Sequence, residues 1–282
     1  MPQEFASALE PWLPPNHVGF VTERCDEETA WALLRRELDA WAAAGRQATV
    51  WWRDDDAYRP LPTLERLLAL STDLDAPVAL AVVPAWLGRD LANALDRHPC
   101  VSVVQHGWSH TNHAGGAGEK GACEVGLHRG RKAILEDLRK GRDVLEDAFA
   151  GCFQPVVTPP WNRIDPALFP DLALMGYRGI STFDARNDEP AAAGLVAQNC
   201  HCDPIDSKAG TGFRGTRRSL VQLTGHLADR REGRVDSDEA TGFLTHHRDM
   251  DEQTWAFAER LIETIVRHPA ARWADARELF LP

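Results

Sequence analysis

Several features are missing from this sequence of 282 residues. No stretch approaches the roughly 18 consecutive apolar residues of a membrane span, and the first residues lack the basic and apolar regions of a secretory signal. Basic residues are fewer than acidic ones, 31 against 42, which gives a net charge of −11. This balance argues against a general affinity for nucleic acid or anionic membranes. We therefore expect a cytoplasmic protein that binds neither.

The six cysteines contain no CxxC pair, which is the spacing of many zinc sites. Because no export signal precedes them, we expect reduced thiols rather than disulfides. Cys200-His201-Cys202 suggests a metal clip, but adjacent strand residues point to opposite faces and no second cysteine pair lies nearby in sequence. We expect no structural zinc in this segment.

The sequence does contain a regular alternation of short strands and longer amphipathic helices. Asp26 precedes a first helix that ends at Gly45, and residues 1–45 are predicted to form an N-terminal helical cap. The predicted strands are Ala48–Trp52, Val78–Val83, Val101–Gln105, Gln154–Val157, Arg178–Thr182, Leu195–Asn199 and Gly242–Thr245. The predicted helices lie around Leu61–Ser71, Trp86–Asp96, Arg131–Phe149, Pro166–Met175 and Ser219–Arg231, with a last helix around Glu252–Val266 after the final strand. This order predicts parallel pairing with right-handed crossovers, and hence an α/β barrel or a doubly wound sheet over residues 46–282.

Polar clusters follow five of these strands at their C-terminal ends. They are Arg53–Asp56, His106–His110, Pro159–Arg163, His201–Asp203 and His246-His247. Each cluster alone has a structural explanation, because Asp favours helix N-caps and turns and Pro-Pro-Trp favours a rigid loop. In a parallel barrel, however, these strand ends meet at one face, where active sites are built. Convergence on that face favours a functional site.

The residue types in these clusters suit a metal centre that hydrolyses its substrate. Two imidazoles and one carboxylate form a three-ligand site with an open position, suited to zinc or another first-row divalent ion. The metal lowers the pKa of a water at that position towards roughly 7, and a second carboxylate can act as general base. A more distant histidine can protonate the leaving group. Asp54–Asp56, His106, His110 and His246 supply all of these groups.

The order Asp-Asp, His-x-x-x-His, Pro-Trp and Leu-x-His, from about Val50 to His246, resembles the polysaccharide deacetylase superfamily of carbohydrate esterases (NodB homology). The resemblance implies a divergent bacterial-type member with a distorted (β/α) barrel of about seven parallel strands. It also implies metal-dependent removal of an acetyl group from an N-acetylated saccharide or related amide. The partner would then be a small-molecule or oligosaccharide substrate.

Carried over residue by residue, the resemblance divides the acidic run. Asp55 corresponds to the general base and Asp56 to a metal ligand, with His106 and His110 as the other ligands. A register one residue earlier, with Asp54 as base and Asp55 as ligand, stays open. Zinc is the expected metal, and other first-row divalent ions are alternatives.

The later motifs supply the general acid and its neighbours. His246, in Leu-x-His, corresponds to the general acid, and Asp203 is expected to orient its imidazole. Where the family keeps an arginine that steers the catalytic aspartate, this chain has Thr158. Arg163 or Arg53 would then supply the missing charge; Arg163 is included in the predicted catalytic set.

Four further residues are expected to contact substrate. Trp161 and Trp108 would form an apolar wall for an acetyl group or sugar ring, because an aromatic face suits either; a place in the core is the alternative. His113, one turn beyond His110, is a substrate contact or a substitute ligand. Asn162 completes the predicted substrate-binding set.

Two other functions stay open. Thr158 at the arginine position and a cytoplasmic location leave room for hydrolysis of another non-peptide C–N bond in a small metabolite, such as a cyclic amide or formamide. A pocket closed by the loop His113–Gly130 would favour that reading. The third is a non-catalytic sugar- or partner-binding protein on a decayed deacetylase scaffold, with the metal absent or its open position obstructed. The sequence fixes neither the substrate nor the metal nor the oligomeric state.

Overall fold

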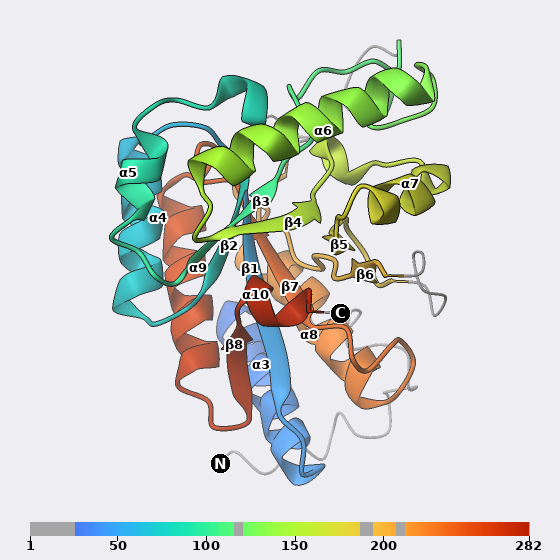
Figure 1. The fold of residues 1–282 in the computed structure, drawn as a ribbon. Helices are drawn as coiled ribbons and strands as arrows, with labels where there is room; N and C mark the ends of the chain where they lie inside the picture. The colour runs from blue at the N-terminus through green and yellow to red at the C-terminus, as the bar shows by residue number, and fades with distance from the viewer. Residues whose placement is uncertain (1–25, 116–120, 187–193, 207–211, 282) are drawn as a thin grey trace, which may run out of the picture.

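The computed structural model describes residues 26–115, 121–186, 194–206 and 212–281. Within these ranges a single sheet of parallel strands has the order β6-β5-β4-β3-β2-β1-β7, and β8 also pairs with β1 (Figure 1). The strands are β1 (Ala48–Ala57), β2 (Val78–Val82), β3 (Val101–Gln105), β4 (Phe153–Val157), β5 (Gly179–Ile180), β6 (Val196–Ala197), β7 (Thr241–Thr245) and β8 (Ala271–Ala274). The predicted distorted (β/α) barrel is confirmed, with seven strands in the curled sheet.

The two edges of this sheet are joined by the segment that follows β6. Cys200 forms a parallel bridge with Phe183, and Cys202 forms one with Phe243 of β7. The amide of Leu244 donates to the carbonyl of Cys202 at 2.8 Å. We call residues 200–203 the seam, because they lie between the β5 side and β7 and close the barrel.

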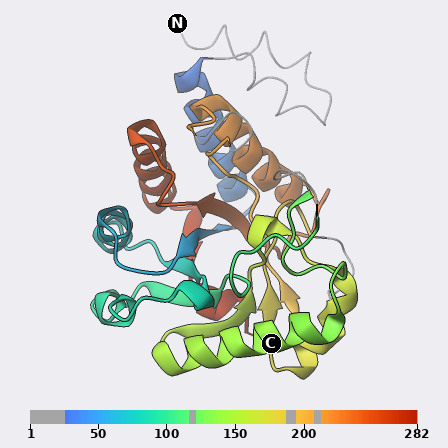
Figure 2. The ribbon, with the colours of Figure 1, turned by 90° about the horizontal axis from the view of Figure 1, so that it is seen from above.

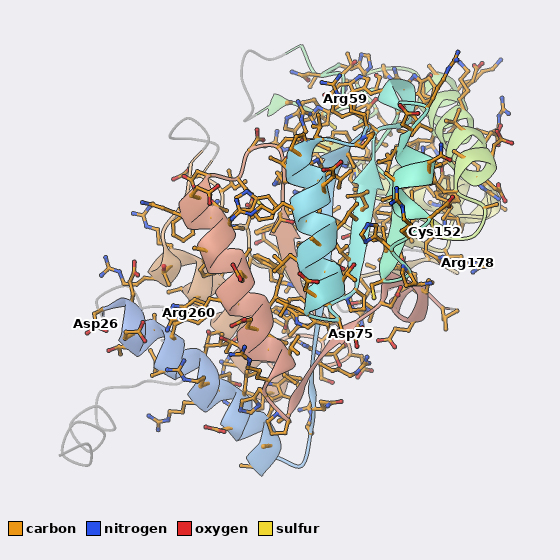
Figure 3. All side chains as sticks on the ribbon, turned by 90° about the vertical axis from the view of Figure 1, so that its left-hand side faces the viewer. Asp26, Arg59, Asp75, Cys152, Arg178 and Arg260 are labelled. Atoms are coloured by element: carbon orange, nitrogen blue, oxygen red, sulfur yellow. The ribbon has the colours of Figure 1, made fainter. Side chains whose placement is uncertain are left out.

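Helices cover the outer face of the strands (Figure 2). They are α3 (Glu27–Ala43), α4 (Pro62–Asp73), α5 (Leu91–Leu95), α6 (Arg131–Ala148), α7 (Phe169–Leu174), α8 (Thr216–Arg231) and α9 (Glu252–Val266). The short helix α10 (Ala276–Leu279) instead packs against the interior of the barrel. Figure 3 shows α3, α9 and α4 along one side, with Asp26 at the start of α3 and Arg260 on α9. Arg260 pairs with Glu28 of α3, which ties these two helices together. Within the described chain, no helix is long and apolar enough to cross a membrane.

Two expectations about the elements are wrong. The helix expected around Trp86–Asp96 is shorter: a 3₁₀ turn at Pro84–Trp86 precedes α5 (Leu91–Leu95). The helix at Glu252–Val266 is not the last element, because β8 and α10 follow it. β8 was missed because it pairs with only the first half of β1 and its four residues are too few to give a clear alternation.

The described part of the predicted N-terminal cap is α3. Asp26 caps it by accepting a hydrogen bond from the amide of Thr29 at 2.8 Å. Its apolar residues Trp31 and Trp41 are buried in the same core as the outward face of β1. Trp41 also donates through Nε1 to the carbonyl of Leu227 on α8. Residues 1–25 of the predicted cap lie outside the described residues, and the division at residue 45 stays a prediction.

Strand residues alternate between an outer core beneath the helices and an inner core within the barrel. In β2, Leu80 belongs to the outer core, whereas Ala79 and Ala81 belong to the inner core together with Trp51 of β1. The ring of Phe280, after α10, packs edge-on against Trp51 at 5.9 Å and fills this interior. Arg53 and Asp55 point to the same face of β1 as Trp51, so β1 places a buried charged pair inside the C-terminal end of the barrel.

Candidate metal centre

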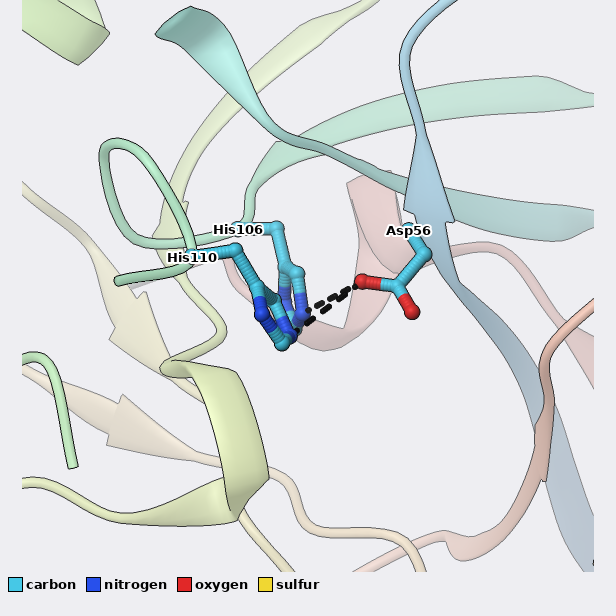
Figure 4. A group of neighbouring side chains, drawn as sticks. All are labelled: Asp56, His106 and His110. Carbon is cyan, nitrogen blue, oxygen red and sulfur yellow. Dashed lines mark ion pairs between the residues drawn. The ribbon is translucent and has the colours of Figure 1, made fainter. Parts of the chain in front are cut away.

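Asp56, His106 and His110 meet at the C-terminal ends of β1 and β3 (Figure 4). The Nε2 atoms of both histidines lie 3.4 Å from Oδ1 of Asp56. Zinc–nitrogen and zinc–oxygen bonds of about 2.0–2.1 Å at tetrahedral angles separate ligand atoms by roughly 3.4 Å. The three side chains therefore have the spacing of one face of a tetrahedral metal site.

The three aspartates that end β1 have three different surroundings. Asp54 accepts hydrogen bonds from the Thr245 hydroxyl at 2.6 Å and the His247 amide at 3.0 Å. Asp55 points into the barrel, and Asp56 follows a register shift in β1 with φ at 71°, a left-handed conformation that Asp tolerates better than most residues. This turn aims the Asp56 carboxylate at the histidines. The geometry thus favours the Asp55/Asp56 register over the Asp54/Asp55 alternative.

A hydrogen bond fixes the protonation of His106. Its Nδ1 lies 2.9 Å from the carbonyl oxygen of Thr158, and a carbonyl can only accept, so Nδ1 carries the hydrogen. In the neutral ring this leaves Nε2 with a free lone pair facing Asp56, the arrangement found in metal-binding histidines. Within the described residues, Oδ1 of Asp56 is buried without a hydrogen-bond partner. A divalent cation fits this bare donor set.

The charges around the centre act differently on its three side chains: burial lowers the pKa of His106, but Asp55 and Asp56 outweigh burial and raise it. Burial raises the pKa of Asp56, but His106, His110 and His246 outweigh burial and lower it. Burial, followed by the nearby His106, lowers the pKa of His110. Asp56 is therefore ionised and His110 neutral at pH 7, which leaves both able to donate an electron pair to a metal.

The loop from His106 to His110 is held by a residue that sequence reasoning missed. Glu124 is 3% exposed and accepts hydrogen bonds from the amides of Trp108, Ser109 and His110, at 3.2, 2.7 and 3.2 Å. These bonds satisfy three successive backbone donors and keep His110 at a φ of 53°. Glu124 lies 14 residues beyond His110 in an irregular segment, so no local pattern pointed to it.

Gly107, directly after His106, makes room for Glu124. A Cβ at this position would overlap Oε2 of Glu124 and lie 2.7 Å from Cδ of Pro160. Gly107→Ala is therefore expected to lower the free energy of unfolding by about 1–3 kcal/mol more than Gly45→Ala, through forced repacking. Gly45 is the matched control, since it has a similar positive φ but nothing within 4 Å of its Cβ. Urea unfolding of both variants measures the difference, and equal losses would contradict the packing argument.

Arg53 holds the carboxylate of Asp55. Its Nη2 donates to Oδ2 at 3.0 Å, and its Nε lies 2.9 Å from Oδ1. The remaining guanidinium hydrogens reach the hydroxyl and carbonyl of Ser181 and the side-chain oxygen of Asn162. Arg163, the arginine in the predicted catalytic set, donates instead to the carbonyl of Ala122 at 3.0 Å. Arg53 is thus the arginine that contacts the Asp55 carboxylate. Its position two residues before Asp55 on the same strand, where side chains share a face, could have predicted this contact.

His246 and Asp203 come together across the seam. Burial lowers the pKa of His246, but the negative charges of Asp203, Asp55 and Asp56 outweigh burial and raise it. Burial raises the pKa of Asp203 in turn, and the charge of His246 opposes this. The two charges therefore influence each other, but within the described residues Nδ1 of His246 has no hydrogen-bond partner and Asp203 Oδ1 accepts from the amide of Ile205. That Asp203 orients His246 stays a prediction.

Solved structures supply the comparison for this arrangement. The chain aligns with a proposed polysaccharide deacetylase from Mycobacterium smegmatis at a TM-score of 0.60, 16% identity, and 84% and 90% coverage of this and that chain. It aligns with a carbohydrate esterase family 4 enzyme from Streptococcus mutans at a TM-score of 0.53, 15% identity, and 89% and 91% coverage. The chain has the polysaccharide deacetylase fold. No protein-family model and no curated protein matches the sequence.

The polysaccharide deacetylase fold does not by itself decide activity. A family 4 pseudoenzyme from Bacillus anthracis aligns at a TM-score of 0.51, 14% identity, and 83% and 66% coverage. A mutant of a family 4 pseudoenzyme with restored activity aligns at a TM-score of 0.52, with 15% identity and 83% and 68% coverage. An active and an inactive protein thus share this fold, so the function depends on the residues of the site.

The predicted substrate residues lie at different distances from the centre of this deacetylase fold. The ring of Trp161 lies 4.4 Å from that of His110, and Asn162 accepts from Arg53. Trp86, which sequence reasoning missed, is 40% exposed and lies 5.8 Å from His110. Trp108 is partly buried in the loop held by Glu124. His113 pairs with Arg129 at 3.0 Å and is not among the three grouped ligands.

A cavity of about 740 Å³ lies beside Asn162. Asn162 and Thr182, both hydrogen-bond acceptors for Arg53, line it, together with Arg163. Cys123 and Gly126–His128, from the loop His113–Gly130, form another part of its lining; residues 116–120 of that loop lie outside the described residues. The cavity thus adjoins the residues that hold Arg53, whereas Asp55 and the three grouped ligands are not part of its lining.

Proposed function

We propose that this protein is a metal-dependent hydrolase that removes the acetyl group from an N-acetylated saccharide or a related amide. The observation that carries the proposal is the orientation of His106, whose Nδ1 faces a backbone carbonyl and whose Nε2 is turned with His110 towards Asp56, while a second carboxylate, Asp55, lies beside them. A bound divalent ion, expected to be zinc, would polarise the acyl carbonyl and acidify water. A sugar- or partner-binding protein would not need this donor set.

Asp55 is the proposed general base. Arg53 contacts it with two nitrogens, so the carboxylate is held in one orientation, in which it can accept a proton from water. Arg53 is a positioning residue in this scheme, in the place that we first gave to Arg163. Its complete burial keeps water from competing for its hydrogen bonds.

His246 is the proposed general acid. The surrounding carboxylates raise its pKa, which favours the protonated imidazole that must give a proton to the departing amine. Asp203 supplies the largest part of this effect among those charges. Trp161 and the exposed Trp86 flank His110 and offer apolar faces on which an acetyl group or sugar ring can pack.

Chelation tests the proposal directly. We expect the purified protein to release acetate from chitooligosaccharides, to lose this activity with a divalent-ion chelator, and to regain it when zinc is added back. The chelated protein should also unfold at a lower temperature, because a ligand that binds only the folded state stabilises it. Acetate release that persists in the metal-free protein would overturn the mechanism.

A second candidate is hydrolysis of another non-peptide C–N bond in a small metabolite. The cavity lined by Cys123 and Gly126–His128 favours it, because its volume of about 740 Å³ is in the range of roughly 300–1,000 Å³ that holds a small molecule. Turnover of N-acetylglucosamine, its oligomers and small formamides under one set of conditions separates the two. Deacetylation that rises with oligomer length would favour the saccharide, and turnover confined to formamides would favour the second candidate.

A further inference from the structure

A second group of two histidines and one carboxylate lies outside the metal centre. It consists of His201 in the seam, His226 on α8 and Glu239 just before β7, which are 6%, 7% and 0% exposed. The Nε2 atoms of His201 and His226 lie 3.5 and 3.7 Å from Oε2 of Glu239. Neither Nε2 atom has a hydrogen-bond partner within the described residues. By distance alone this group resembles the metal centre.

The hydrogen bonds behind the rings distinguish the two groups. The amide of Gly242 donates to Nδ1 of His201 at 2.9 Å, and because an amide can only donate, that nitrogen must be unprotonated. The hydrogen of the neutral ring is then on Nε2 and points at Glu239. This is the opposite of His106, whose Nδ1 faces a carbonyl and whose Nε2 is bare. His201 is thus unable to offer Nε2 to a metal unless it becomes an imidazolate.

The second ring has a similar environment. Nδ1 of His226 lies 3.0 Å from the Thr241 hydroxyl oxygen, which also accepts from Arg230 at 3.0 Å. The hydroxyl hydrogen is therefore available to Nδ1, and on this basis we assign the hydrogen of the neutral ring to Nε2. The rings of His201 and His226 stack at 3.3 Å with an angle of 13° between their planes. The Nε2 atoms of stacked rings point along nearly parallel planes. Two histidines that bind one ion must instead point their nitrogens at a single position.

Glu239 connects this pair to the barrel wall. Its Oε2 accepts from the amide of Arg186 at 2.8 Å and its Oε1 from the amide of Asn199 at 3.1 Å. Burial raises the pKa of Glu239, but the two histidines and the Arg186 amide outweigh burial and lower it. Glu239 is accordingly ionised, with neutral N–H groups as its neighbours. One carboxylate joins α8, the seam and the segments beside β5 and β6.

We propose that His201, His226 and Glu239 form an acid-sensitive latch that binds no metal and holds α8 against the seam while both imidazoles are neutral. A proton added to either ring would place a cation against its stacked neighbour and close to Arg230, on side chains that are only 6% and 7% exposed. The charged groups that face the latch or Arg230 are Glu239, Arg230, Arg46, Asp236 and Asp238. Asp184, Asp229 and Arg234 line a cavity of about 360 Å³ that His201 and His226 also line.

The sign of the pH dependence follows from the direction of the shift. Burial, as the main cause, lowers the pKa of His226 to about 4 and also lowers that of His201, although Glu239 opposes both changes. Between about pH 6.5 and about pH 4 the two imidazoles bind protons in the unfolded chain but stay neutral in the folded latch. The latch therefore stabilises the fold fully above about pH 6.5 and loses this contribution as the pH falls.

Unfolding in urea across this pH range tests the latch. Each imidazole that is protonated only in the unfolded chain raises the unfolding equilibrium constant by up to about tenfold for each pH unit by which the pH falls. His226→Gln should therefore reduce the pH dependence of this constant by up to about that factor per pH unit. Gln retains a neutral N–H group but cannot be protonated. The control is His128→Gln, at an exposed histidine, which should leave the slope unchanged. An equal slope in wild type and His226→Gln would overturn the latch.

Two further measurements remain decisive if His226→Gln does not fold. Nuclear magnetic resonance of the wild-type histidines should show two rings with the hydrogen on Nε2 whose titration midpoints lie below the ordinary histidine value. Zinc analysis should find one equivalent per wild-type chain, and none after Asp56→Asn. Ordinary midpoints for both rings, or a second zinc equivalent that survives Asp56→Asn, would overturn the proposal. None of these readouts depends on the catalytic reaction.

Discussion

Asp55→Asn is expected to lower kcat for acetate release by about 10²- to 10⁴-fold while the protein keeps its metal. The amide has nearly the shape of the carboxylate but cannot accept a proton from water. The metal is expected to remain because the three grouped ligands are Asp56, His106 and His110. Acetate release and zinc content, measured on the same preparation, check both halves of the prediction.

Two companion variants define what this result means. Asp56→Asn should lose both the activity and the metal, because it removes the only carboxylate of the ligand group. Asp73→Asn, on the exposed end of α4, should change neither. If Asp55→Asn stays fully active, Asp55 is not the base. If it loses its metal as well, the register with Asp55 as a ligand regains support.

Arg53→Met is expected to destabilise the fold by about 3–5 kcal/mol, because it leaves a buried carboxylate without its counter-charge. Arg53 and Asp55 are 0% and 2% exposed, so water cannot replace the lost bonds. Where the variant folds, kcat should fall along with stability, since Asp55 loses its fixed orientation. Arg53→Lys should recover only part of both, because an ammonium cannot bind a carboxylate with two parallel N–H groups.

The matched control is a surface pair in which an arginine also contacts one carboxylate through two nitrogens. Arg66 binds Glu252 through two bonds of 2.7 and 3.1 Å, but both side chains are in contact with solvent. Arg66→Met should therefore change the urea midpoint only slightly, since water screens exposed ion pairs. Arg163→Met separates the two candidate arginines: a loss of kcat as large as that of Arg53→Met would show that Arg163 also steers the base.

Much of the framework was predictable from local patterns. The seven strands of the curled sheet and the long helices follow from apolar periodicity, and the polar clusters follow from where those strands end. Asp56, His106 and His110, which the resemblance implied as ligands, do lie together; their binding of a metal stays a proposal. The short strand β8 gave too little periodicity to be recognised.

The support around the centre was not predictable in the same way. Glu124 holds the histidine loop from an irregular segment, and Thr158, which first indicated only a missing arginine, orients His106 through its carbonyl. Contacts made by backbone carbonyls and amides cannot be predicted from the identity of the side chain, because nearly every residue carries these groups. The sequence did not decide between Arg53 and Arg163. The structure shows that Arg53 and Asp55 lie on the inner face of β1 and contact each other.

By itself, the sequence determined the order of strands and helices, the barrel class and the strand ends that carry polar residues, because periodicity and turn chemistry act over a few residues. Only the tertiary structure decided which nitrogens are bare and which carboxylates are paired. His106 meets Thr158 across 52 positions, and Asp54 meets His247 across 193. Closure of the sheet brings such groups together, and their hydrogen bonds then separate a metal centre from a metal-free latch with nearly the same spacing.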